Sequence, residues 1–259
     1  MHERCLNGDK TMVEMTVSNQ HKDAAQVLAE LTQRNSELQV RVRMLEAELK
    51  ERHQAPQRAL SVTDVLRMKK ETFKFEGPWA DAFGEPERKG VWFVWGQSGS
   101  GKTTFVMQLC KELARFGKVA YNSLEEGDGL TMRNMLMTNG MSDVKKNFVL
   151  LNAERMSDLG RRLAKRKSPD IVVIDSFQYT EMSFKEYLRF TQVHGDKLLI
   201  FISQAEGSKP AGRTARSVMY DASLKIWVEG YRAFSKGRYI GPTGQYTIWE
   251  ERAKIYWGE

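Results

Sequence analysis

The residues from Gly96 to Thr103 combine glycines, a lysine and hydroxyl side chains at a spacing that suits phosphate binding. They fit the pattern G-x-x-x-x-G-K-[ST] at each fixed position. Glycines let several backbone N–H groups converge on phosphate oxygens, and the helix that follows directs the positive end of its dipole at the same anion. The sequence therefore predicts a phosphate-binding loop, with Thr104 beside it. The loop consists of Gly96, Gln97, Ser98, Gly99, Ser100, Gly101, Lys102 and Thr103.

A second group expected at this site is a carboxylate on a neighbouring strand. Asp175 ends the apolar run 171–174, which is typical of a buried strand followed by a magnesium-binding aspartate. We expect Lys102 to bridge the β- and γ-phosphates of ATP. Thr103 and Asp175 are the expected ligands of the accompanying Mg²⁺.

Hydrolysis also needs a group that orients or deprotonates the attacking water. Ser176 follows Asp175, so the base is not expected there. A pair of carboxylates instead ends the segment 119–126, where a strand is predicted. Glu125 is the first candidate for the general base, and Glu126 is the second.

The elements that would position these residues alternate along the chain. We expect strands near 91–95, 119–121, 148–151, 171–174 and 198–202, separated by helices near 103–116, 130–137, 159–167 and 184–190. Strands that alternate with helices predict an α/β fold with a doubly wound, mainly parallel sheet. Beyond residue 223 the pattern changes to segments at 224–228, 231–239 and 245–249, which we expect to be antiparallel strands.

The chain before this domain has a different pattern. Apolar residues recur at spacings of three and four, which is typical of the a/d seam of a coiled coil. Asn35 falls at an a position of this seam, where it favours a parallel, in-register dimer. The seam residues are Leu28, Leu31, Asn35, Leu38, Val42, Leu45 and Leu49. The expected organisation is a disordered segment 1–23, a coiled-coil helix 24–52, a linker 53–76 and an ATPase domain 77–259.

Composition limits the class of protein. The 259 residues carry a net charge of +7 and a pI of about 9.3, which favours a polyanionic partner such as nucleic acid. The two cysteines, Cys5 and Cys110, form neither a disulfide framework nor a metal site. The first residues lack an apolar secretory segment, and the longest apolar run, 198–202, is too short to cross a bilayer. We therefore expect a cytoplasmic protein without a membrane segment.

Basic residues gather in two places. The segment 205–220 contains Lys209, Arg213 and Arg216 against one acid, Glu206, and its glycines and proline suggest a mobile loop at its start. Such side chains would neutralise nucleic-acid phosphates. A second cluster, at 161–167, lies near a predicted helix C-terminus, where cations are favourable in any case.

The segment 77–259 resembles the RecA-like ATPases, in particular the cores of bacterial replicative helicases and of RadA-like recombinases. Four features carry this resemblance. The first three are the phosphate loop with Asp175, the stretch Ser123-Leu124-Glu125 and the stretch 201–204. The fourth is Lys236-Gly237-Arg238 followed by Gly241-Pro242-Thr243-Gly244. The whole chain is most similar to the compact RecA-type ATPases of phages and mobile elements.

The resemblance implies roles for the later motifs. Gln204 would sense the γ-phosphate and pass the signal to a DNA-binding loop at Lys209, Arg213 and Arg216. Lys236 and Arg238 would reach across a subunit boundary into the ATP site of the neighbour and stabilise transition-state charge. The implied partners are single-stranded DNA and further copies of this chain in a ring or filament.

Two functions remain open at this point. The first is a DNA-dependent ATPase that acts in recombination or replication. The second is a nucleotide-switched helper that recruits a recombination or replication partner protein through the coiled coil. A small-molecule kinase is disfavoured because no lid or acceptor site is visible in the sequence.

Overall fold

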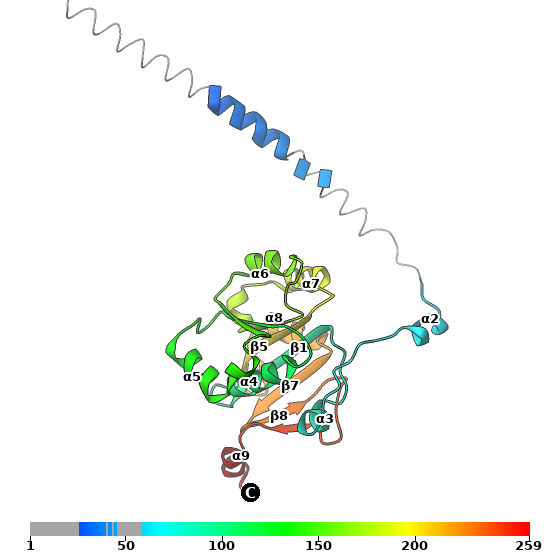
Figure 1. The fold of residues 1–259 in the computed structure, drawn as a ribbon, viewed down its shortest axis with the longest axis vertical. Coiled ribbons are helices and arrows are strands. Elements are labelled where there is room, and N and C mark those ends of the chain that lie inside the picture. The colour runs from blue at the N-terminus through cyan, green and yellow to red at the C-terminus, as the bar shows by residue number, and fades with distance from the viewer. Residues whose placement is uncertain (1–25, 40, 43, 46–58) are drawn as a thin grey trace, which may run out of the picture. The chain divides into compact units, whose positions relative to one another are not determined.

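The computed structural model describes residues 26–39, 41–42, 44–45 and 59–259 (Figure 1). The chain divides into two units, Met1–Met68 and Lys69–Glu259. The first 23 residues, which were expected to be disordered, lie outside the described residues, as do Leu49 and the first part of the expected linker, residues 53–58.

The first unit contains a helix over residues 26–39, and 41–42 and 44–45 are also helical. The predicted seam lies on this helix and is exposed to solvent: Leu28, Leu31, Leu38 and Val42 are each more than half exposed. A second helix, α2 (Val62–Arg67), follows. It begins at a capping box in which Ser61 and Asp64 satisfy each other's backbone N–H groups.

The second unit contains a nine-stranded sheet in the order β3-β2-β4-β5-β1-β7-β8-β9, with β6 paired to β5. In this sheet order, β3, β2, β4, β5, β1 and β7 are parallel to one another. Strands β7, β8 and β9 pair in antiparallel fashion, and β6 forms an antiparallel hairpin with β5. The strands are β1 (Gly90–Gly96), β2 (Val119–Ser123), β3 (Phe148–Asn152), β4 (Ile171–Asp175), β5 (Leu198–Glu206), β6 (Lys209–Pro210), β7 (Leu224–Glu229), β8 (Arg232–Ser235) and β9 (Gln245–Thr247).

Helices cover both faces of this sheet. They are α3 (Pro78–Phe83), α4 (Lys102–Leu113), α5 (Leu130–Thr138), α6 (Met156–Leu163), α7 (Phe184–Val193), α8 (Arg213–Asp221) and α9 (Glu250–Trp257), with 3₁₀ turns η1 (Met141–Val144) and η2 (Phe177–Thr180). Alternate side chains of the central strands enter two separate cores, one with α3, α4 and α5 and the other with α6, α7 and α8. A strand buried on both faces has to be apolar throughout, which explains the continuous run 171–174.

The doubly wound, mainly parallel sheet with antiparallel C-terminal strands is confirmed, but three details differ from expectation. Residues 224–228 were expected to be antiparallel, yet β7 runs parallel to β1 and only its pairing with β8 is antiparallel. Residues 231–239 form a shorter strand, β8. The helices α3, α8 and α9 had not been expected. Helix α9 lies at the C-terminal end of the chain (Figure 1).

The compact unit also begins earlier than the expected boundary at residue 77. Phe73 and Phe75 are buried, and their rings stack with centroids 5.4 Å apart. Both rings pack against Trp92 on β1. The second half of the segment expected to be a linker is therefore part of the core.

Candidate nucleotide site

The phosphate loop joins β1 to α4. Gly99 and Gly101 have φ values of 74° and 96°, a left-handed conformation that favours glycine. Gly96 is required for a different reason: a Cβ there would lie 2.2 Å from the carbonyl oxygen of Val228 on β7. The sequence pattern thus follows from backbone geometry, and the loop leads directly into the first turn of α4.

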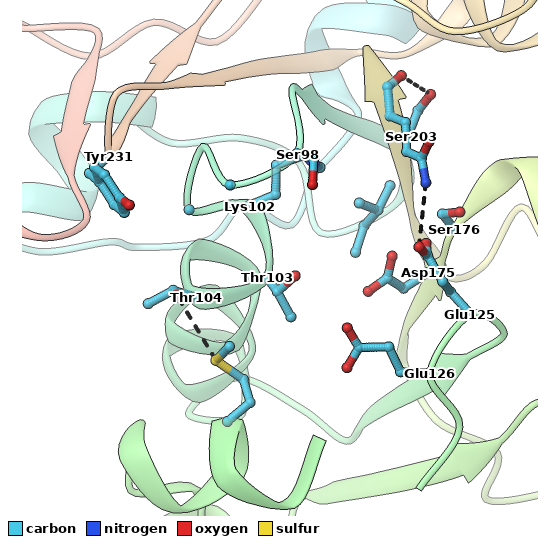
Figure 2. Close-up of a pocket in the computed structure, with 15 residues that line it drawn as sticks. Ser98, Lys102, Thr103, Thr104, Glu125, Glu126, Asp175, Ser176, Ser203 and Tyr231 are labelled. Carbon is cyan, nitrogen blue, oxygen red and sulfur yellow. Dashed lines mark hydrogen bonds between the residues drawn. The ribbon is translucent and has the colours of Figure 1, made fainter. Parts of the chain in front are cut away.

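A pocket of about 440 Å³ opens at the carboxyl edge of the sheet beside this loop. Figure 2 shows the carboxylates of Glu125, Glu126 and Asp175 on the opposite side of the pocket from Lys102 and Thr103. The pocket is lined by Ser98, Gly99, Gly101, Lys102, Thr103, Thr104, Glu125, Glu126, Met135, Asp175, Ser176, Ile202, Ser203, Gln204 and Tyr231. The sheet register produces this convergence, because Ser123 lies opposite Asp175 and Gly96 lies opposite Gln204.

Lys102 lies at the start of α4 and its Nζ donates to the carbonyl oxygen of Gln97, at 2.7 Å. Burial lowers the pKa of the Lys102 side chain, while the carboxylates of Asp175 and Glu125 act against this shift. The lysine is therefore a partly desolvated cation that faces acidic groups across the pocket. Such a group gains stabilisation from an anion bound in the loop.

Asp175 ends β4 and is half-buried. Burial raises the pKa of Asp175 to about 6, a hydrogen bond from the hydroxyl of Tyr121 lowers it, and the nearby carboxylates of Glu125 and Glu126 raise it. The charges of Glu125 and Glu126 thus disfavour the ionised form of Asp175, and a bound cation would stabilise that form.

The oxygen donors at this site fit Mg²⁺. This cation prefers oxygen ligands and is commonly held by one or two carboxylates together with nucleotide phosphates. Among the described residues, no group of three or more His, Cys, Asp or Glu side chains forms a ready-made metal site. The buried hydroxyls of Ser100 and Ser176 have no hydrogen-bond partner in the described part of the chain. Buried polar groups are normally satisfied, so these hydroxyls suggest that a ligand completes the site.

The predicted base and the predicted sensor are in contact. The Nε2 atom of Gln204 donates to Oε1 of Glu125 at 3.4 Å. Figure 2 marks this contact by a dashed line that ends at Glu125. The backbone N–H groups of Leu124 and Glu125 donate to the carbonyl oxygen of Asp175, at 2.6 and 3.2 Å. The turn after β2 is therefore held against the end of β4, and both Glu125 and Glu126 line the pocket.

The two cations of the K-x-R element do not reach this pocket. The backbone N–H groups of Lys236 and Arg238 donate to the carbonyl oxygens of Lys225 and Ser223, at the amino end of β7. The phosphate loop lies at the carboxyl end of the neighbouring strand β1. A strand of six residues spans roughly 20 Å. Lys236 and Arg238, both exposed, therefore lie at the opposite edge of the sheet from the phosphate loop of the same chain.

The basic segment 205–220 is a hairpin followed by a helix, not the mobile loop expected at its start. Residues 205–206 pair with 209–210, and α8 begins at Arg213. Arg216 forms an ion pair with Glu206 at 3.3 Å and donates to the carbonyl oxygen of Pro210, so it has a structural role. Lys209 and Arg213 are exposed and form no ion pair with any described residue.

Two side chains of the phosphate-loop region also hold this hairpin. Trp95 Nε1 donates to the carbonyl oxygen of Ser208 at 3.0 Å, and Gln97 Nε2 lies 3.5 Å from the carbonyl oxygen of Gly207. The tip of the hairpin, residues 207–208, is thus attached to β1 and to the phosphate loop.

Comparison with known proteins identifies the domain. Residues 85–183 match a family model described as an AAA domain, and the match includes the phosphate loop, Glu125 and Asp175. This match supports a P-loop ATPase domain of RecA-like fold in the second unit. No curated protein matches the chain.

Solved structures also match this chain. One is an ATPase domain with 17% identity and a TM-score of 0.46, for which the match covers 61% of this chain and 80% of the other. Another is a KaiC-like protein from Pyrococcus horikoshii OT3, with 17% identity and a TM-score of 0.45, covering 62% and 89%. Among the described residues, no helix combines the length and apolar character needed to cross a membrane.

Sequence reasoning missed several residues of the ATPase pocket. Ser176 could have been found, because it directly follows Asp175. Tyr231 reaches the pocket from the turn between β7 and β8, where its backbone N–H donates to the carbonyl oxygen of Ser100 at 3.1 Å. Met135 lies on α5, with its sulfur 3.8 Å from Thr104 Oγ1. No spacing in the sequence relates Tyr231 or Met135 to the phosphate loop.

Proposed function

We propose that this chain hydrolyses ATP as a ring or filament of identical subunits and acts on single-stranded DNA in recombination or replication. The main observation in support of this proposal is that two sets of residues lie apart in the subunit. The phosphate loop, Asp175 and Glu125 meet at the carboxyl edge of the sheet, whereas Lys236 and Arg238 lie at the amino edge. A second subunit that docks its amino edge on this carboxyl edge would complete the site.

Within one subunit, the phosphate loop would bind the nucleotide phosphates. Backbone N–H groups of residues 96–103 would contact phosphate oxygens, and Lys102 would exchange its contact with Gln97 for the β- and γ-phosphates. The hydroxyl of Thr103 and the carboxylate of Asp175 would hold Mg²⁺, which neutralises phosphate charge when it is bound.

Glu125 would orient or deprotonate the attacking water, and its contact with Gln204 would fix the carboxylate in place. Glu126 remains the alternative base because it lines the same pocket. Lys236 and Arg238 of the neighbouring subunit would stabilise the negative charge that develops on the transferred phosphoryl group.

Single-stranded DNA would bind along the hairpin and α8. Lys209 and Arg213 are exposed cations that can neutralise phosphates, whereas Arg216 is engaged within the protein. Two routes join this surface to the nucleotide. Gln204 connects Glu125 to β5, and Trp95 and Gln97 connect β1 and the phosphate loop to the hairpin tip.

ATP turnover with and without single-stranded DNA at low salt tests this function. DNA should stimulate turnover, and the double variant Lys209→Ala/Arg213→Ala should lose the stimulation while keeping its basal rate. Removing two phosphate contacts should lower the slope of log affinity against log salt by about 1.4. Lys165→Ala/Arg166→Ala, which removes two exposed cations from the end of α6, is the matched control. Turnover that does not respond to DNA would refute the proposed action on DNA.

The second candidate is a nucleotide-switched helper, and the exposed apolar stripe on the helix of residues 26–39 favours it. In this case the stripe would bind another protein and hydrolysis would time its release. Deleting residues 1–56 separates the candidates. Loss of partner recruitment with intact DNA-stimulated turnover would favour the helper.

A further inference from the structure

Tyr121 places a hydroxyl group inside the sheet, next to the nucleotide site. The residue lies on β2 and is fully buried. Its hydroxyl donates to Oδ2 of Asp175 on the adjacent strand β4. A buried hydroxyl costs free energy unless it is hydrogen-bonded, and a phenylalanine would fill the same core position without that requirement. The significance of this hydroxyl therefore lies in its partner.

The sheet register determines what the hydrogen bond does to Asp175. Ser123 lies opposite Asp175, and Tyr121 is two residues earlier on the same face of the sheet. Tyr121 thus approaches the carboxylate from inside the sheet, while Asp175 also lines the nucleotide pocket. Oδ2 is engaged by the tyrosine. Among the described residues no side chain or backbone group donates to Oδ1.

We propose that Tyr121 is a positioning residue: its hydroxyl holds Oδ2 of Asp175 inside the sheet, so that Oδ1 is presented to the cation bound with the nucleotide. This inference rests on the proposed role of Asp175 at the Mg²⁺ site. A carboxylate can rotate about its terminal bond, and this freedom is lost when a cation binds. A donor that fixes the carboxylate beforehand reduces that loss. Outer hydrogen-bond partners of metal ligands typically change metal affinity tenfold to a hundredfold.

The structure offers a matched control for this tyrosine. Tyr187 on α7 is also fully buried, and its hydroxyl donates to the carboxylate of Asp221 at 2.6 Å. Neither Tyr187 nor Asp221 lines the nucleotide pocket. Each of the variants Tyr121→Phe and Tyr187→Phe therefore removes a hydroxyl that donates to an aspartate carboxylate. Tyr121→Phe does so beside the nucleotide pocket, and Tyr187→Phe does so away from it.

The experiment measures binding of a fluorescent ADP analogue to the full chain, first in EDTA and then as Mg²⁺ is added. Tyr121→Phe should bind the analogue like the wild type in EDTA. Its half-saturating Mg²⁺ concentration should rise about tenfold. Tyr187→Phe should leave that concentration unchanged, and Asp175→Asn should raise it at least as much as Tyr121→Phe does. Thermal unfolding of each variant shows whether it is folded.

The outcomes separate this inference from the proposed function. If Asp175→Asn raises the Mg²⁺ requirement and Tyr121→Phe does not, the positioning role is wrong and the metal site stands. A rise of equal size in Tyr121→Phe and Tyr187→Phe would show a general effect of core tyrosines and would also overturn it. An Mg²⁺ requirement that is insensitive to Asp175→Asn would refute the proposed metal site itself.

A measurement on the wild type covers the case in which Tyr121→Phe does not fold. With ¹³Cζ-labelled tyrosine, adding Mg²⁺ to the ADP complex should shift the Tyr121 signal and leave the Tyr187 signal in place. A Tyr121 signal that is unaffected by Mg²⁺ would overturn the inference.

Discussion

At the scale of single residues, the pocket contains two adjacent carboxylates that could serve as the base. Only Glu125 is in contact with Gln204, whereas the carboxylate of Glu126 forms no hydrogen bond within the described residues. We predict that Glu125→Gln keeps nucleotide binding and lowers kcat by about 100-fold or more, as expected for loss of a general base. Glu126→Gln should change kcat only a few-fold. Steady-state turnover with a fluorescent nucleotide titration checks this, and the reverse ranking would assign the base to Glu126.

The charge of Lys102 gives a second prediction at this scale. Lys102→Ala should abolish nucleotide binding, because the loop loses the only lysine among the residues that line the pocket. Lys111→Ala is the control. This lysine lies on the same helix, where it pairs with Asp143 at 2.7 Å. Isothermal titration with ATP measures both variants, and retained affinity in Lys102→Ala would argue against the proposed phosphate contacts.

The residues that could be predicted from sequence are those whose role depends on consecutive neighbours. The phosphate loop needs glycines at set positions, Asp175 ends β4, and Glu125 lies two residues after the end of β2. Tyr121 could not be predicted, because its role depends on the pairing of β2 with β4, whose residues are more than fifty positions apart in sequence.

At the scale of elements, the same reasoning explains which parts of the fold were visible. Strands that are buried on both faces, such as β1 and β4, appear as apolar runs. Five strands, among them the partly exposed β3, were expected at nearly their observed positions. Helix α9 was missed because its sequence has no clear apolar stripe: Ile255 is 82% exposed, whereas Ala253 is buried. The parallel direction of β7 was missed because it depends on α8 returning the chain to the other edge of β1.

The N-terminal helix supports a prediction at the element scale. If its exposed stripe pairs with a second copy, Asn35 lies at a buried a position and weakens the pair while fixing its register. Asn35→Ile should therefore strengthen self-association of the full chain, measured by sedimentation equilibrium. Ser36→Ala, on the outward face of the same helix, is the control. Unchanged association in Asn35→Ile would indicate that the stripe does not form a coiled-coil dimer.

At the scale of the whole molecule, the position of Lys236 and Arg238 bears on how subunits would assemble. These cations lie at the edge of the sheet opposite the phosphate loop, so they cannot act on the nucleotide of their own subunit. Arg238→Ala should thus keep ATP binding and lose turnover, and Glu125→Gln should do the same for a different reason.

Mixing these two variants tests whether the site is shared. An interface is productive when the subunit that binds ATP keeps Glu125 and its neighbour keeps Arg238. In an equimolar mixture that assembles at random through head-to-tail interfaces, roughly a quarter of the interfaces meet both conditions. Turnover should therefore recover to about a quarter of the wild-type rate, measured after joint dissociation and reassembly. Native mass spectrometry would show whether mixed oligomers form. If they form and remain inactive, Arg238 does not complete the neighbour's site.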